Sequence, residues 1–236
     1  MLRRTAVLLA CLRVVLAGAQ TASFGLYGGT VHTWYNTGTS DVRSTWAVGP
    51  QFGARLFFDL TDDLDLSLNL GYELTGYDEL LHAPNVQERV VPVRAGHVAV
   101  SLEVAGMVAS SAPKWRLFIG LSYDHLAGVE SKDGDDGDWH GMDYTQCPGF
   151  SMPIGIRYTF SPGREHSVYL DLYGKGVFGQ DFRYPDHAGL GYAYVPHDPE
   201  HVPAARDFVV GVRFGIRFGK WSMKAQVQQP RRPFDQ

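Results

Sequence analysis

The segment LDLSLNLGYELT, residues 64–75, decides the fold of this chain. Every second position in it is Leu or Tyr, and each position between them is polar or Gly. Successive side chains of a β-strand point to opposite faces of the sheet. The segment is therefore predicted to be a strand with one apolar face and one polar face.

The same alternation recurs along the rest of the chain. It is regular in 115–124, 150–160, 168–177 and 208–218, and less regular near 23–35, 45–59 and 89–104. Helical periodicity is almost absent. Together with 64–75, these segments predict an all-β protein with eight strands.

The connections between these strands are the second signal. They fall near 36–44, 60–63, 76–88, 105–114, 125–148, 161–167 and 178–206, and the odd-numbered ones are the longer. An antiparallel meander places odd and even connections at opposite ends. The pattern therefore predicts short turns at one end and long loops at the other, the layout of an up-and-down transmembrane β-barrel.

Composition narrows the class of protein further. The chain has 236 residues, of which 44% are hydrophobic, and this excludes general disorder. No apolar run approaches the roughly 18 residues that a membrane-spanning helix needs. The net charge of −4 gives no electrostatic case for binding nucleic acid.

Residues 1–19 are predicted to be a secretory signal peptide. Arg3 and Arg4 precede the apolar stretch TAVLLACL, and Ala17-Gly18-Ala19 provides a small-residue cleavage site. A lipoprotein signal ending at Cys11 is the alternative, although only ten residues precede that Cys. Cleavage near Ala19 would leave 18 basic and 25 acidic residues, a net charge of −7, and a lone Cys147 that has no partner for an internal disulfide.

Alternation alone leaves open whether the apolar face points inward, as in a soluble lipocalin-like barrel, or outward to lipid. Several observations favour lipid: the apolar face is complete over five or six positions per strand, and the other face mixes Gly with charges of both signs. Aromatic residues at the ends of the apolar runs are typical of membrane interfaces. The predicted interface aromatics are Trp34, Trp46, Trp115, Phe160 and Trp221.

These features resemble the small eight-stranded outer-membrane barrels, the group of OmpX, OmpW and the OmpA transmembrane domain. The last strand, GVRFGIRF at 211–218, is similar to the terminal signal read by the barrel-assembly machinery. The resemblance implies a location in the outer membrane, contact with its lipid and insertion by that machinery. It predicts a barrel over 22–219 and a short periplasmic tail over 220–236, although the tail is also able to prolong the last strand.

The polar face of such a barrel would form its lumen. Eight strands leave an interior that side chains just fill, and charges buried there must pair. If Phe160 lies opposite Val168, Arg157 lies opposite Asp171. We therefore predict a plugged interior held by a lumen charge network of Asp65, Glu73, Glu103, Arg116, Asp124, Arg157, Asp171, Lys175, Arg213 and Arg217.

The predicted function is that of a surface protein whose loops, above all 125–148 and 178–206, contact a host or environmental ligand. One alternative is an OmpW-like conduit for a small solute, which the inward aromatics Phe57, Phe118, Tyr169 and Tyr173 leave open. A lipid-modifying enzyme is less favoured, because none of the nine His is followed by Ser in a His-x-Ser arrangement. The sequence indicates no catalytic residue and no cofactor. The acidic run 133–138 lacks the spacing of an EF-hand, and the His197–His201 segment carries Pro199, so no metal site is predicted.

Overall fold

The computed structural model describes residues 19–36, 42–43, 47–81, 89–132, 138–141, 145–146, 149–161, 166–178, 182–183 and 203–222. Eight long strands form the body of the protein: β1 (Thr21–Asn36), β3 (Ala47–Asp59), β4 (Leu64–Leu81), β5 (Arg89–Met107), β6 (Trp115–Ser131), β9 (Gly149–Thr159), β10 (His166–Phe178) and β12 (Pro203–Ser222). Four strands of two residues each accompany them: β2 (Val42–Arg43), β7 (His140–Gly141), β8 (Thr145–Gln146) and β11 (Phe182–Arg183).

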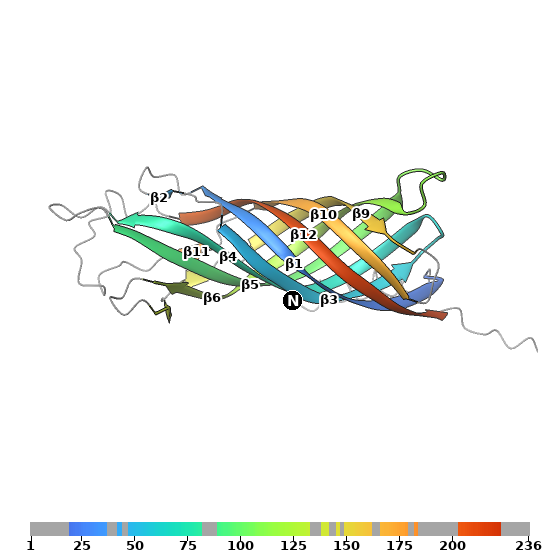
Figure 1. The fold of residues 1–236 in the computed structure, drawn as a ribbon, viewed down its shortest axis with the longest axis horizontal. Coiled ribbons are helices and arrows are strands. Elements are labelled where there is room, and N and C mark those ends of the chain that lie inside the picture. The colour runs from blue at the N-terminus through green and yellow to red at the C-terminus, as the bar shows by residue number, and fades with distance from the viewer. Residues whose placement is uncertain are drawn as a thin grey trace, which may run out of the picture.

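The long strands form a closed antiparallel barrel. Each pairs with the next along the chain, in the order β1-β3-β4-β5-β6-β9-β10-β12, and β12 pairs with β1 to close the ring. Figure 1 shows the strands inclined to the long axis of the molecule, as closure of a barrel requires. The structure thus confirms the all-β, eight-stranded, antiparallel barrel predicted from the alternation.

One end of the barrel carries the connections 60–63, 108–114 and 160–165, together with the start of β1 and the end of β12. We call it the short-turn end, and we call the opposite end, where β2, β7, β8 and β11 lie, the loop end. In Figure 1 the short-turn end is on the right. Among the described residues there is no helix long and apolar enough to cross a membrane.

The apolar face of the alternation points outward. Large apolar side chains are exposed on all eight long strands, among them Leu68 and Leu70 of β4 and Leu117, Ile119 and Leu121 of β6. Leu66 is on the same face of β4 but is buried, directly opposite Phe58 in one ladder and Val104 in the other. The polar positions between the apolar ones point into the barrel.

Several strand boundaries predicted from the sequence were wrong at the loop end. Strand β4 continues to Leu81, β6 continues to Ser131 and β12 begins at Pro203, so strand structure occupies parts of the predicted connections 76–88, 125–148 and 178–206. A register shift between β5 and β6 explains part of the error. Gly96 pairs with Gly128 but His97 pairs with Leu126, and the skipped Ala127 interrupts the alternation of apolar and polar residues that predicts a strand.

The end of the chain differs slightly from the predicted division at residue 219. Strand β12 runs to Ser222, so the predicted tail contributes its first residues to the last strand. Residues 223–236 and residues 1–18, which include most of the predicted signal peptide, lie outside the described part of the chain.

Candidate functional site

The lumen is the candidate site, and a cluster of buried ions occupies its middle. Glu103 is fully buried and lies within ion-pair distance of three guanidinium groups: Arg213 at 2.9 Å, Arg55 at 3.2 Å and Arg157 at 3.5 Å. The Asp171 carboxylate accepts hydrogen bonds from Arg55 Nη1 at 2.7 Å and from Arg157 Nε at 2.8 Å. These side chains come from β3, β5, β9, β10 and β12, so the cluster ties strands across the full width of the barrel.

The register places one of these pairs where the sequence predicted it. Phe160 N donates to the carbonyl of Val168, and Arg157 lies directly opposite Asp171 in the β9–β10 ladder. Because both side chains are on the inward face, the guanidinium reaches the carboxylate through Nε and Nη2, at 2.8 and 3.2 Å. Bidentate contacts of this kind are among the stronger polar interactions in proteins.

A second ionic cluster lies nearer the loop end. Lys175 Nζ is 2.6 Å from Glu73 and 3.2 Å from Asp124. Ser122 and Ser151 also donate to the Asp124 carboxylate, at 2.8 and 2.9 Å. All these side chains are buried, so one ammonium group and two hydroxyls replace water as the partners of the two carboxylates.

Two neutral side chains join the clusters. The Tyr173 hydroxyl donates to Gln51 Oε1 at 2.8 Å and lies 3.5 Å from Glu73. Gln51 Oε1 also accepts from Arg213 Nε at 3.3 Å, and the Arg213 guanidinium stacks 3.9 Å from the centre of the Tyr173 ring. The polar network is therefore continuous between the two clusters.

Glycine on the inner wall makes room for the aromatic rings of this network. A Cβ on Gly211 would meet the ring of Tyr173, and a Cβ on Gly215 would meet the ring of Tyr169. The Tyr27 ring lies against Gly53 and Gly71 in the same way. The Gly content of the polar face thus has a packing reason, because a Cβ at these positions would collide with a tyrosine side chain.

Toward the loop end the inward face carries both polar and apolar buried side chains, and the polar ones include Thr33, Thr75 and His97. Val31, Val93, Leu126, Val129 and Val209 point inward and are almost completely buried. We call this group the apolar plug.

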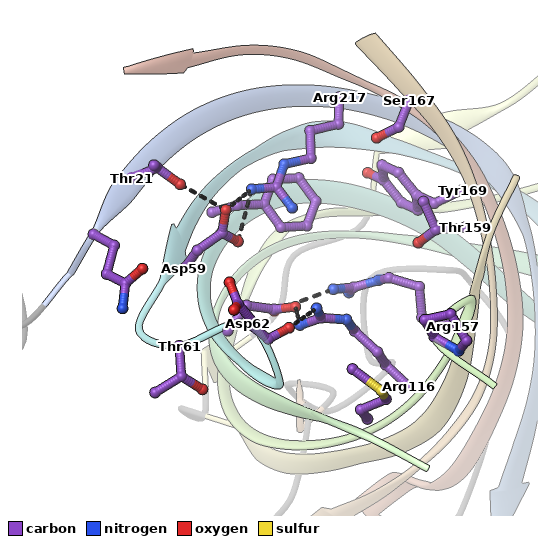
Figure 2. A pocket seen from close by; sticks show the side chains of 15 residues that line it. Thr21, Asp59, Thr61, Asp62, Arg116, Arg157, Thr159, Ser167, Tyr169 and Arg217 are labelled. Atoms are coloured by element: carbon purple, nitrogen blue, oxygen red, sulfur yellow. Dashed lines mark hydrogen bonds and ion pairs between the residues drawn. The ribbon is translucent and has the colours of Figure 1, made fainter. Parts of the chain in front are cut away.

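At the short-turn end the lumen opens into a cavity of about 350 Å³, which we call the mouth. Two ion pairs stand at its rim: Arg217 contacts both oxygens of Asp59 at 2.8 Å, and Arg116 contacts Asp65 at 2.6 Å. Figure 2 shows Arg217 with Asp59 on one side of the opening and Arg116 on the other, with Tyr169, Ser167 and Thr159 along a third. The interior thus changes from a polar mouth, through ionic clusters, to a loop end lined by both apolar and polar side chains.

The structure places all ten residues of the predicted charge network on the inward face. Eight are buried, while Arg116 and Arg217 at the mouth are partly exposed. Arg55 and Gln51 of β3 also belong to the network, although the alternation did not predict them. Phe52, Ala54 and Leu56 alternate along the outward face of β3, and this alternation places Gln51 and Arg55 on the inward face. The inward Phe57 interrupts the contrast between the two faces and hides the pattern in the sequence.

The predicted interface aromatics divide between the two ends. Trp115, Phe160 and Trp221 are exposed at the short-turn end, where the Tyr158 ring lies 4.7 Å from Trp115 and 5.0 Å from Phe160. Trp34 packs 5.7 Å from Phe208 toward the loop end. Trp46 is outside the described residues, as are 133–137 of the predicted acidic run and the whole His197–His201 segment. No group of three or more potential metal ligands occurs among the described residues.

The closed ring of eight antiparallel strands, apolar outside and polar inside, defines the chain as a small outer-membrane-type β-barrel. Among solved structures, the chain is similar to Neisserial surface protein A, with 11% identity over 84% of this chain and 98% of that one, and a TM-score of 0.44. It is also similar to OprG from Pseudomonas aeruginosa, with 11% identity over 86% and 98% and a TM-score of 0.46.

A major outer membrane protein from Thermus thermophilus gives 16% identity over 85% of this chain and 99% of that one, with a TM-score of 0.48. No protein-family model and no curated protein sequence matches the chain. At these identities and TM-scores, the similarity assigns no function.

Proposed function

We propose that this protein spans an outer membrane as a filled, non-conducting barrel and meets its surroundings through its loop end. The observation that carries the proposal is the contrast between the two faces of the wall. Exposed large apolar side chains on all eight strands are unfavourable in water but suit a lipid bilayer. The buried charged side chains of the strands lie in the lumen, where they pair.

The absence of conductance follows from how the lumen is filled. The Arg55–Glu103–Arg213 contacts lie across the middle of the barrel, and moving an ion past them would separate buried charge pairs. The five side chains of the apolar plug, together with the buried Thr33, Thr75 and His97, fill the lumen further toward the loop end. A lumen filled by paired charges and buried side chains supports a plugged barrel over the conduit that the sequence left as an alternative.

Contact with a host or environmental ligand is the proposed role of the loop end. The export signal predicted over 1–19 and the barrel topology together imply that this end faces outward. The structure describes the strand residues in which the segments 125–148 and 178–206 begin or end. These two segments are the longest of the predicted connections, so they offer the largest number of residues for such contact. We propose no catalysis.

Two measurements test the proposal. The purified barrel in a planar bilayer should give no steady channel, and its gel mobility should change on heating, as for a folded barrel. Large, steady conductance would favour the conduit. An epitope inserted at Asp136 should be reached by antibody on intact cells, whereas an epitope after Gln236 should be reached only in permeabilised cells; the reverse result would contradict the proposed orientation.

A further inference from the structure

The outer wall of the barrel carries a groove of about 360 Å³ near the short-turn end. Every residue that lines it is apolar or aromatic: Trp115 of β6, Ile156 and Tyr158 of β9, and Leu170 and Leu172 of β10. Tyr158 lies opposite Trp115 in one ladder and opposite Leu170 in the other, so the groove follows β9 between its two neighbours. Its floor is recessed, because Ile156 and Tyr158 are half-buried whereas Ile154, the next outward residue of β9, is 50% exposed.

One end of this groove lies at the level of the interface aromatics. Trp115, Tyr158 and Phe160 pack their rings together there, and aromatic rings of this kind mark the headgroup level of a membrane. From Tyr158 to Ile156 the floor advances roughly 7 Å along the strand, away from the short-turn end. The groove therefore begins at the headgroups and extends into the hydrocarbon, which is the path of a lipid acyl chain.

A basic residue, Lys114, stands at the headgroup end of the groove. It immediately precedes Trp115, and its carbonyl accepts a hydrogen bond from Thr159 N at 2.8 Å, beside Tyr158. The Lys114 side chain is exposed and makes no ion pair with any residue that the structure describes.

Other basic groups at the same end are already engaged, because Arg116 is paired with Asp65 and Arg217 with Asp59. The Lys114 ammonium is therefore available to an anion that lies at the membrane surface beside the groove.

We propose that this groove is a binding site for a phospholipid of net negative charge in the leaflet on the short-turn side. The groove takes the part of one acyl chain nearest the headgroup, and the Lys114 ammonium binds the phosphate. The inference rests on the proposed function, because the outer wall must first meet lipid. One basic side chain near a membrane surface favours an anionic lipid by a factor of about three to ten.

Quenching of tryptophan fluorescence by brominated lipid tests the site. In a probe variant of the full chain, Phe replaces Trp34, Trp46, Trp139 and Trp221, so that Trp115 is the only tryptophan. The probe variant is reconstituted in vesicles of brominated phosphatidylcholine, into which unbrominated phosphatidylglycerol or phosphatidylcholine of the same chain length is mixed.

We expect phosphatidylglycerol to relieve the quenching of Trp115 with a binding constant about threefold to tenfold that of phosphatidylcholine. Equal relief by the two lipids would overturn the proposed site but leave the membrane span intact. No quenching of Trp115 by brominated lipid would refute the membrane span together with the site.

Two pairs of changes, made in the probe variant, locate the binding. Lys114→Gln removes the ammonium and should reduce the preference to about one, whereas Lys132→Gln, on an exposed lysine at the loop end, should leave it unchanged. Ile156→Phe fills the floor of the groove and should weaken the preference, whereas Ile154→Phe on the neighbouring outward position should not. Heat-modifiable gel mobility shows that each barrel folds, and a preference of undiminished strength in Lys114→Gln or in Ile156→Phe would refute the assignment.

Salt provides a measurement that needs no further substitution. At 1 M salt the contact between an exposed ammonium and a phosphate is screened, so the preference of the probe variant should fall toward one. A preference that does not change with salt would contradict the role of Lys114.

Discussion

Replacing Glu103 by Gln should be one of the most destabilising isosteric changes in the barrel. The substitution keeps the size of the side chain and one oxygen acceptor, but it removes the charge that faces three guanidinium groups at 2.9, 3.2 and 3.5 Å. Each hydrogen bond to a charged group contributes about 1.5–3 kcal/mol, and two of these contacts are short. The expected loss is about 3–5 kcal/mol, the cost of breaking a buried ion pair by neutralising one partner.

The matched control is Glu130→Gln. Glu130 also pairs with an arginine, Arg94, but both side chains are at least one-third exposed. Water screens such a pair, so the expected loss is about 0–1 kcal/mol. The two variants carry the same chemical change and differ in burial.

Equilibrium unfolding in urea, with the barrel in lipid vesicles and tryptophan fluorescence as the signal, measures both free energies. Adding Arg213→Met to Glu103→Gln should recover part of the loss, since it removes one guanidinium left without its carboxylate. If Glu103→Gln costs no more than Glu130→Gln, the buried cluster does not stabilise the barrel and the reasoning is refuted.

Two other changes test the wall of the barrel. Gly211→Ala should lower the free energy of unfolding by about 1–3 kcal/mol, because the new methyl group meets the Tyr173 ring. Gly176→Ala is the control, since a Cβ there meets no atom within 4 Å, and it should change the free energy of unfolding little. Equal urea midpoints for the two variants would argue against packing of the Tyr173 ring on Gly211. Leu70→Arg puts a charge in the outer apolar band and should cost about 2–4 kcal/mol in vesicles. Leu70→Phe is expected to fold normally, and tolerance of Arg as well as Phe would show that this face does not meet lipid.

The wall of the barrel was predictable because its signal is local. Alternation between apolar and polar residues depends only on neighbours in the sequence, and 64–75 shows it without interruption. Where a bulge skips Ala127, the alternation changes phase, and the inward position of Val129 was missed. The local signal fails where the backbone departs from regular pleating.

The contacts across the lumen were less predictable. Arg157 and Asp171 face each other on neighbouring strands, so a single register defines their pairing. Arg55 reaches Asp171 from β3, and Lys175 of β10 reaches Glu73 of β4, on strands that are not adjacent in the ring. Such pairs depend on the tilt and closure of the whole barrel, which alternation within single strands does not define.

The pairing of β1 with β12 sets the order of events during folding. This ladder joins residue 21 to residue 222, so the ring cannot close before the end of the chain is available. Until then β1 has one unpaired edge, and an open edge of this kind invites pairing with other chains. Contacts between residues so distant in sequence also form slowly. Loss of the last twenty residues of the barrel, 203–222, would therefore leave two open edges on an otherwise complete sheet, a species prone to aggregate.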